Sequence, residues 1–337
     1  MGNKLELLSR DDLDRIHDAT LNVLRNTGAR FLYDKALKVL DANGCEVDWK
    51  TKIVRFPEEL VKECIAKAQG QHATKYDTRQ TPDLVEMPKQ DVYFRPFGQG
   101  VRITDRDGTT RSSTLRDIKN VVIIGDALES LDVVSTMVYA SDMPRWTAGL
   151  HSTEVLMTRG DCPVDPVIQP AGYTPVEETE EEKARRRTRV REYRLEMACA
   201  YYGMDVDELR KRASREIMSA GGCPNSPLTH ASEILEGQMW AAERGFPSGG
   251  LSQAMTGATA PITLPGTMVV HNAELISLIT LLQLIQPGLP CRHSSSTCTI
   301  DMRKGYCTVG TPEMGLISAM AMQLAQYYDL DCTVAGA

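Results

Sequence analysis

The spacing of apolar residues predicts helices in the first third of the chain. Apolar residues recur at roughly helical intervals from Leu13 to Leu24. Ser9 and Asp12 precede them in a capping-box arrangement, and Gly28 follows as a helix terminator. Similar signals predict two further helices, at 34–42 and 58–67.

The stretch from residue 91 to 113 has a different pattern. The short segments Val92-Tyr93-Phe94 and Val101-Arg102-Ile103 are followed by the turn Asp105-Arg106-Asp107-Gly108. Such segments around a turn are typical of a β-hairpin. We therefore predict that residues 1–113 form an amino-terminal helical cap with a small β-hairpin.

From Thr114 onward, helical segments alternate with short apolar runs. Thr114 is expected to cap a helix that reaches Glu129, and the near-continuous apolar run at 133–139 is typical of a strand buried on both faces. The remaining predicted strands are 166–169, 215–221, 247–254, 289–297 and 331–336, and the remaining helices are 174–202, 229–244, 267–285 and 313–327.

Repeated alternation of strand and helix predicts a parallel sheet with crossover helices. A GxGxxG motif after the first strand is absent from the sequence, which weakens a dinucleotide-binding fold. We therefore predict an α/β fold with a TIM (β/α)8-type barrel over residues 114–337. About six strands are counted where such a barrel has eight, so we expect the carboxyl-terminal strands to be missing and the sequence to be a piece of a longer protein.

Composition narrows the function classes. The net charge of -7 and the pI near 5.5 argue against nucleic acid as the main partner. The absence of an evident apolar run of about 18 residues and of a signal sequence favours a cytoplasmic protein without a membrane segment. Nine widely spaced cysteines favour a reducing compartment over a disulfide framework. A zinc site drawn from Cys291, His293, Cys298 or Cys307 remains an alternative.

The predicted helix at 174–202 carries acids first and arginines later. Glu180 to Glu182 lie in its first turns, and five arginines follow between Arg185 and Arg191. This order suits the helix dipole and predicts a solvated helix face. An anion-binding site is the alternative.

Small and hydroxyl residues gather where two predicted strands end. One group includes Gln253 and Thr256, and the other includes Ser295 and Ser296. Small residues let a ligand approach the backbone, and hydroxyl and amide groups can orient it. A role in tight packing alone is the alternative.

Polar residues also interrupt a predicted apolar helix. His271 and Glu274 lie within it, and buried polar groups there need partners or a function. A satisfied core network and a site role therefore both remain open. Asp301 and Glu313 follow the serine-rich strand and are further candidates for the site.

Several sequence blocks, in order and at matching spacing, resemble the trimethylamine methyltransferase family, including its relatives that lack pyrrolysine. The blocks are Asn43 to Asp48, Pro96 to Val101, Ala254 to Pro261, Pro265 to Thr267, His271 to Glu274, Ser294 to Thr297 with Asp301 and Lys304-Gly305, Gly310 to Ser318, and Val334 to Gly336. The resemblance implies a TIM barrel, a methylated amine as substrate, and transfer of the methyl group to the Co(I) of a partner corrinoid protein.

The resemblance also implies site residues. In the trimethylamine enzymes pyrrolysine follows a Val-Ala-Gly stretch, and this sequence has Ala337 there. Alignment at this position implies a member without pyrrolysine that acts on quaternary amines such as glycine betaine, although pyrrolysine directly after Ala337 is also compatible. The expected catalytic residues are Glu274, Gln253 and Ala337, and the expected substrate-binding residues are Phe97, Gln99, Thr256, His271, Ser295, Ser296, Asp301 and Glu313.

A cationic amine favours carboxylates and aromatic faces, for which Glu274, Glu313 and Phe97 are the candidates. A carboxylate tail would suit the region of Ser295 and Thr256. The expected cobalamin belongs to the cognate corrinoid protein, so we expect no metal site and no tightly bound cofactor in this chain. We also expect a homo-oligomer with a role in one-carbon metabolism such as methanogenesis. The alternatives are a non-catalytic quaternary-amine-binding protein of the same fold and a zinc-dependent barrel enzyme.

Overall fold

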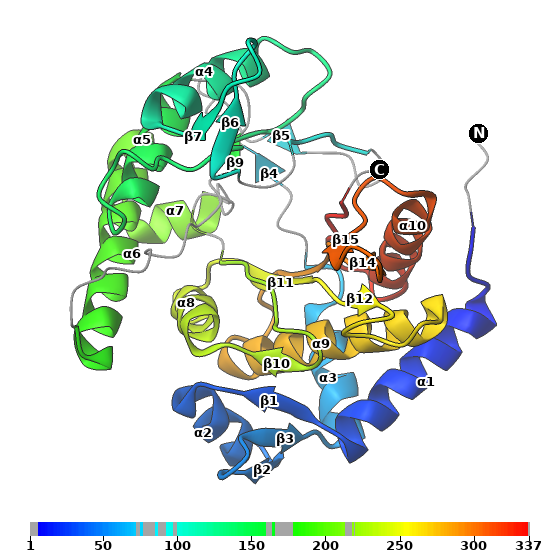
Figure 1. Ribbon diagram of the computed structural model, residues 1–337. Coiled ribbons are helices and arrows are strands. Elements are labelled where there is room, and N and C mark those ends of the chain that lie inside the picture. The colour runs from blue at the N-terminus through cyan, green and yellow to red at the C-terminus, as the bar shows by residue number, and fades with distance from the viewer. Residues whose placement is uncertain are drawn as a thin grey trace. The chain divides into compact units, whose positions relative to one another are not determined.

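A computed structural model of the chain describes residues 6–71, 75–76, 85–86, 92–96, 100–159, 164–165, 178–212, 218 and 220–335. The chain forms two compact units (Figure 1). The first unit comprises Met1–Ala73 and Ala220–Ala337, and the second comprises Thr74–Ser219. This division differs from the predicted boundary at residue 113, because the chain leaves the first unit near residue 73 and returns to it at residue 220.

The first unit combines helices with short strands. Its helices are α1 (Arg10–Asn26), α2 (Asp34–Ala42), α3 (Glu58–Ala68), α8 (Ser232–Ala242), α9 (Leu264–Ile285) and α10 (Pro312–Tyr327). Its strands are β1 (Ala29–Phe31), β2 (Glu46–Asp48), β3 (Ile53–Arg55), β10 (Thr229–His230), β11 (Ser248–Ser252), β12 (Met255–Thr256), β13 (Cys291–Ser295), β14 (Cys298–Asp301) and β15 (Tyr306–Cys307). The helix predicted at 229–244 begins later than expected, since Thr229 and His230 belong to β10.

The amino-terminal helices form as the sequence predicts. The Ser9 hydroxyl accepts a hydrogen bond from the Asp12 N–H, and the Asp12 carboxylate accepts one from the Ser9 N–H, which confirms the capping box of α1. Gly28 then turns the chain with φ of 79°, and a Cβ at this position would clash with the Val54 carbonyl. The chain continues into a four-stranded sheet with the order β10-β1-β3-β2.

Parallel segments joined by helices make up the rest of the first unit. β11 pairs in parallel with β13 from Ser248 to Ser252. Ala220 bridges β11, and Asp331 and Val334 bridge β13, all in parallel. α8, α9 and α10 connect these four segments in chain order. The strand predicted at 331–336 is thus reduced to two bridges, residue 336 lies outside the described residues, and a closed barrel stays a prediction.

α9 is the central helix of the first unit. It packs against α1, α3, β11 and β13 (Figure 1). By length and composition it could cross a membrane, contrary to the expectation from the sequence, but 78% of its most apolar window is buried inside the protein. Burial against helices and strands on several sides explains why it is apolar all round.

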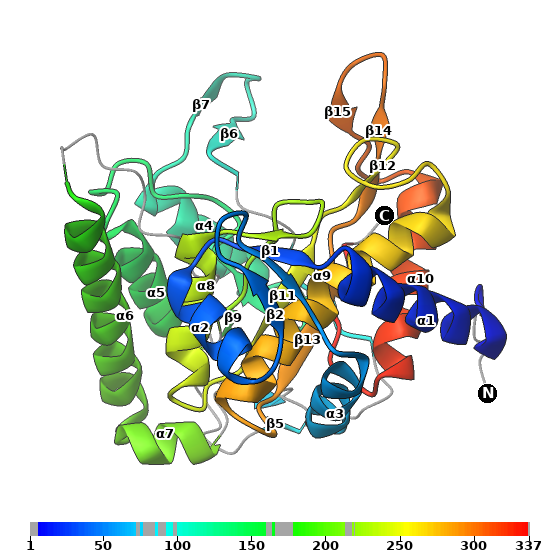
Figure 2. The same ribbon diagram turned by 90° about the horizontal axis from the view of Figure 1, so that it is seen from below.

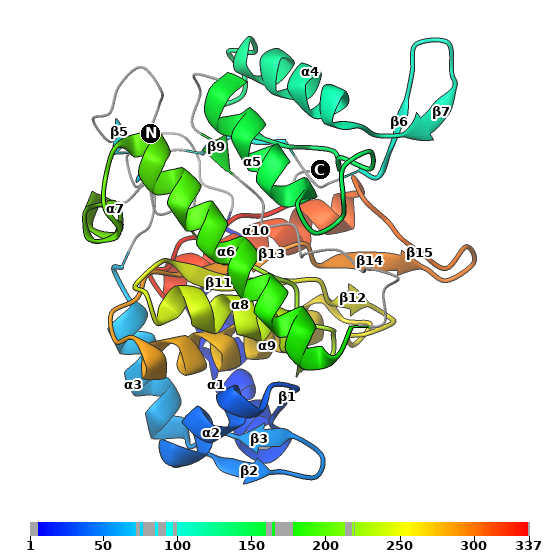
Figure 3. The ribbon, with the colours of Figure 1, turned by 90° about the vertical axis from the view of Figure 1, so that its left-hand side faces the viewer.

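The second unit contains helices and two-stranded sheets. Its elements are β4 (Lys75–Tyr76), β5 (Val85–Glu86), β6 (Arg102–Thr104), β7 (Thr110–Ser112), α4 (Leu115–Asp126), β8 (Val134–Ser135), α5 (Ala148–Arg159), β9 (Val164–Asp165), α6 (Glu180–Tyr202) and α7 (Val206–Arg212). α5 packs against α4 and against the long helix α6 (Figure 3). The strand predicted at 133–139 shrinks to β8, which pairs in parallel with β9. The strand predicted at 166–169 lies outside the described residues.

The predicted hairpin forms in part. β6 and β7 pair in antiparallel around the turn that begins at Asp105. The run at 92–94 is not a strand: the Phe94 N–H donates to the Asp132 carboxylate at 2.7 Å, and both Val92 and Phe94 are exposed. The prediction of a strand at 92–94 was wrong, because an apolar run of three residues is equally compatible with an irregular segment whose backbone N–H is bound by a carboxylate.

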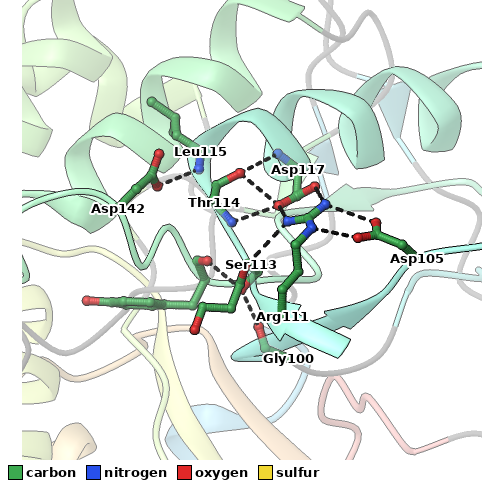
Figure 4. A network of polar contacts seen from close by, with 10 residues as sticks. Gly100, Asp105, Arg111, Ser113, Thr114, Leu115, Asp117 and Asp142 are labelled. Atoms are coloured by element: carbon green, nitrogen blue, oxygen red, sulfur yellow. Dashed lines mark hydrogen bonds and ion pairs between the residues drawn. The ribbon is translucent and has the colours of Figure 1, made fainter. Parts of the chain in front are cut away.

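An arginine joins the hairpin to α4 (Figure 4). The Arg111 guanidinium forms two hydrogen bonds with Asp105 and two with Asp117, at 2.7–3.1 Å. Asp117 also accepts from the N–H and hydroxyl of Thr114, so it completes the capping box of α4. The Arg111 hydrogen bonds lower the pKa of Asp117 far below its usual value, and we assign this network a structural role.

Candidate functional site

The carboxyl ends of four parallel segments lie side by side in the first unit. Ser252 is paired with Ser295 across β11 and β13, and Ser295 bridges Val334. On the other side of β11, the Leu251 N–H donates to the Gly222 carbonyl at 3.1 Å. We call this row of strand ends, defined by Gly222, Ser252, Ser295 and Val334, the carboxyl edge. Ligands of α/β sheets bind at such edges.

Several predicted site residues lie at the carboxyl edge. Gln253 directly follows β11 and is exposed, whereas Ser295 and Ser296 are buried. The Ser296 N–H donates to the Ser252 carbonyl at 2.8 Å, and the Ser295 hydroxyl accepts from the Thr297 N–H at 3.2 Å. The serine residues therefore shape the backbone here, and Gln253 presents its amide to solvent.

Glu274 reaches the carboxyl edge from α9. Its carboxylate accepts hydrogen bonds from the Ser252 hydroxyl at 2.7 Å, the Ser226 hydroxyl at 3.0 Å and the Leu228 N–H at 3.0 Å. The side chain is fully buried, and burial raises the pKa of the carboxyl although the three hydrogen bonds oppose the shift. These contacts tie the loop at 226–228 to the end of β11, as a satisfied core network would.

His271 lies one turn earlier on the same face of α9. Its Nδ1 lies 3.1 Å from the Thr297 hydroxyl, which in turn donates to the Ser252 carbonyl at 3.3 Å. Thr267, four residues before His271, lies 3.0 Å from the Thr256 hydroxyl and donates to the Pro261 carbonyl at 2.8 Å. Residues spaced by four and three positions share one face of a helix. Thr267, His271 and Glu274 therefore line one face of α9, and each forms a hydrogen bond with a residue near a strand end.

A second polar network lies behind His271. The His293 Nε2 lies 2.8 Å from the Asn272 amide oxygen, and the Asn272 amide nitrogen donates to the hydroxyls of Tyr328 and Thr20 at 2.8 and 2.9 Å. Burial lowers the pKa of His293 to about 4 and that of His271 well below its usual range. Both imidazoles are therefore neutral at physiological pH.

Of the remaining predicted residues, the structure describes Asp301 and Glu313. Asp301 ends β14 and accepts the N–H groups of Arg303 and Lys304, so its carboxylate closes a turn. Glu313 is exposed in the first turn of α10, where a negative charge suits the helix dipole. Phe97, Gln99 and Ala337 lie outside the described residues.

The loop partners of Glu274 were not predicted from the sequence. Ser226 and Leu228 lie in the Asn225-Ser226-Pro227-Leu228 turn after the first parallel segment, and nothing in their local pattern indicated a distant carboxylate. The available signal was the spacing of Thr267, His271 and Glu274 on one helical face.

The cysteines partly differ from expectation. A disulfide joins Cys298 to Cys307, which was not predicted from the sequence. The Cys291 thiol accepts from the Gln283 amide at 3.3 Å, and burial raises its pKa to about 12. Within the described residues there is no cluster of three His, Cys, Asp or Glu side chains suited to a metal ion, so the proposed zinc ligands are not assembled in this part of the chain.

The first unit combines helices with parallel strand segments, whose ends carry an exposed amide and buried hydroxyl groups next to the buried polar face of α9. The chain belongs to the trimethylamine methyltransferase (MTTB) family, whose profile matches residues 2–337.

Characterised relatives agree with this assignment. A trimethylamine methyltransferase of Methanosarcina acetivorans is 35% identical over 342 residues, which cover 99% of this chain and 64% of the relative. A trimethylamine methyltransferase of Desulfitobacterium hafniense is 36% identical, with 99% and 63% coverage. A glycine betaine methyltransferase of Desulfitobacterium hafniense is 26% identical, with 96% and 63% coverage. The chain thus spans somewhat less than two thirds of the length of these relatives.

Proposed function

We propose that the protein transfers a methyl group from a methylated amine, either trimethylamine or a quaternary amine such as glycine betaine, to the Co(I) of a partner corrinoid protein. Membership of the family, together with four strand ends that meet at one edge, is the observation that carries the proposal. The activities named for the relatives give the substrate class.

The donor groups at the carboxyl edge suit an organic ligand. An exposed amide such as that of Gln253 can orient an amine, but it is a poor ligand for cobalt. This chemistry fits a corrinoid held by the partner protein, which supplies the nucleophile. The chain's own task is then to bind the amine and align one of its methyl groups, and such alignment can supply much of the rate.

Different side chains take different parts in this task. Gln253, exposed directly after β11, orients the substrate, whereas Glu274 and His271 fix the backbone on which Gln253 and Thr297 stand. A quaternary amine leaves as a neutral tertiary amine, so its departure requires no general acid. The predicted catalytic role of Glu274 then becomes one of holding the loop at 226–228 against β11.

The direct test uses the full-length protein with a reduced corrinoid protein and a series of methylated amines. We expect an amine-dependent change in the corrinoid absorption spectrum together with release of the demethylated amine. Calorimetric binding of a quaternary amine without any such change would instead support the non-catalytic binding protein.

A matched pair of variants tests the site. Gln253→Ala should lower kcat/KM by about tenfold, since a polar contact of the amide with the charged ligand is lost. Gln286→Ala is the control, because Gln286 is also exposed but lies beyond the opposite end of α9. Equal activity of the two variants would remove Gln253 from the site.

A further inference from the structure

Four sulfur-bearing side chains gather beside the carboxyl edge. Cys298 and Met314 are buried together with Ala335, and Met255 and Cys307 pack against them. The sulfurs come from β12, β14, β15 and the first turn of α10. A disulfide joins Cys298 and Cys307 within this cluster, and the function proposed above does not use it.

The strand register explains how the two cysteines meet. β14 and β15 are antiparallel, with Ile300 opposite Cys307. Cys298 lies two residues before Ile300 and so points to the same face, diagonally opposite Cys307. The two Cα atoms are 6.4 Å apart, a separation that a disulfide spans without backbone movement.

The two sulfurs differ in access. Cys298 is fully buried, whereas Cys307 is half-buried in the hairpin formed by β14 and β15. This hairpin projects away from α9 and α10 (Figure 2), and Met302 and Tyr306 in it are exposed. A thiol from solution can therefore reach the Cys307 sulfur more readily than the Cys298 sulfur.

The disulfide is continuous with the carboxyl edge. Cys298 directly follows Thr297, the residue that bonds to His271, and its N–H donates to the Ala254 carbonyl at 3.2 Å. Ala335 in the same cluster donates its N–H to the Ser295 carbonyl at 2.9 Å. The cross-link therefore closes the base of the projecting hairpin, next to the backbone on which the candidate site stands.

We propose that Cys298 and Cys307 form a reversible redox modification site that takes small thiols and disulfides of the glutathione class. In reduction, a thiolate attacks the Cys307 sulfur, the bond between Cys307 and Cys298 breaks, and its electron pair leaves with Cys298, which takes up a proton. A second thiol then displaces Cys307 from the mixed disulfide. Two thiols are oxidised to one external disulfide, and the protein disulfide gains two electrons and two protons.

Two methionines determine the surroundings of the reduced pair. Met314 is buried in the same cluster as Cys298, and Met255 packs against that cluster, so the Cys298 thiol stays in an apolar environment when the base of the hairpin opens. The opening loosens Thr297 and, through it, the carboxyl edge. The redox chemistry does not depend on the proposed function. The effect of reduction on turnover does depend on the proposed function.

The first experiment maps the thiols of the full-length protein without any substrate. The protein is equilibrated in buffers of varied ratio of reduced to oxidised glutathione, alkylated and analysed by mass spectrometry. We expect Cys298 and Cys307 to change together from cross-linked to alkylated within the buffered range. A pair that stays wholly reduced or wholly oxidised at every ratio overturns the proposal.

The second experiment measures hairpin release by limited trypsin digestion at Arg303 and Lys304, which are exposed at its tip. Reduction should speed cleavage there by about tenfold, because the cross-link no longer restrains the loop. Cys307→Ser should be cleaved at the fast rate in both buffers. Cys199→Ser, a partly exposed thiol in the second unit, should keep the redox dependence of the parent. Equal cleavage rates for the oxidised and reduced parent protein would overturn the proposal.

Turnover is then compared in the two redox states. We expect a change of about tenfold in the parent protein, since small displacements of positioning groups have large effects on rate, and no change in Cys307→Ser. Equal turnover of both states in the parent would overturn the effect on activity. Absence of turnover in either state would count against the proposed function, while thiol mapping and proteolysis would still decide the redox site.

Discussion

Two helices of nearly equal length, α9 and α6, differ in how deeply their polar side chains are buried. α9 has 22 residues, and its polar side chains from Thr267 to Gln283 are fully buried. α6 has 23 residues, all of them described, and only Arg194 and Ala198 are buried. The polar residues of α9 therefore need partners inside the protein, whereas those of α6, apart from Arg194, are partly or fully exposed.

The partners of the two helices differ in distance along the chain. On α9, Glu274 bonds to Ser226, 48 residues away, and His271 to Thr297, 26 residues away. On α6, Lys183 pairs with Glu180 and Arg189 with Glu192, each three residues away, and Arg186 pairs with Glu178, eight residues away. The polar groups of α9 specify which segments meet, whereas the ion pairs described for α6 join residues that are close together in the chain.

The strongest test of this contrast removes the carboxylate of Glu274. Glu274→Leu should lower the free energy of unfolding by about 3 kcal/mol or more, because the donors of Ser226, Ser252 and Leu228 lose their acceptor. Urea denaturation measures the change. An unchanged midpoint would mean that water satisfies these donors and that the buried network is not needed for stability.

Glu274→Gln separates stability from activity at the same position. The amide oxygen still accepts hydrogen bonds, so the loss of stability should be smaller than for Glu274→Leu. Turnover should nevertheless fall strongly, since two hydroxyl groups and an N–H must rearrange around the amide. Full turnover would exclude Glu274 from both catalysis and positioning.

Acid should weaken the network behind His271. Burial lowers the pKa of His293 from 6.5 to about 4, so the unfolded chain takes up a proton before the folded protein does. Stability from His293 is complete above pH 6.5 and is lost as the pH falls towards about 4, by up to about 3 kcal/mol. Glu274 acts in the opposite sense: its pKa is raised above 4.5, and its contribution is lost as the pH rises through the raised pKa.

The measurement compares urea midpoints at several pH values for the parent protein and His293→Gln. The variant should show a shallower loss on acidification, with the remaining slope due to His271 and other titrating groups. Identical slopes in the two proteins would show that His293 is protonated equally in the folded and unfolded states.

The sequence predicted local features better than long-range ones. The helix at 34–42 and the caps at Ser9 and Thr114 are confirmed, because their signals lie within a few residues. The run at 133–139 became a two-residue strand, since pairing with β9 extends over Val134 and Ser135 alone. The length of a strand depends on the partner with which it pairs elsewhere in the chain, and the local pattern of apolar residues does not indicate that partner.

The same distinction applies to the candidate site. Gln253 and Ser295 were placed correctly at strand ends, because those ends follow from local patterns. Asp301 was expected at the site on sequence proximity alone, yet its carboxylate closes the turn of a projecting hairpin. The contacts of Glu274 depended on the loop at 226–228, whose position no local pattern encodes.

A smaller effect is expected where a polar contact is half-exposed. In the second unit Asp117 is 7% exposed and also caps α4, whereas Asp105 is 40% exposed and contacts the same Arg111 (Figure 4). Asp117→Asn should therefore cost about 1–2 kcal/mol, and Asp105→Asn less. Thermal unfolding of the two variants decides the order. Equal costs would mean that the Arg111 pair, rather than the cap, carries the stability.

The smallest effect is expected on α6. Glu180→Gln removes the exposed pair with Lys183, which is local, screened by salt and replaceable by water. Neither the urea midpoint nor turnover should change measurably, and raising the salt concentration should not alter that result. A clear loss of stability or turnover would mean that the acidic start of α6 binds a group outside its own helix. The two helices would then differ in which partners their polar residues bind, and not in how deeply those residues are buried.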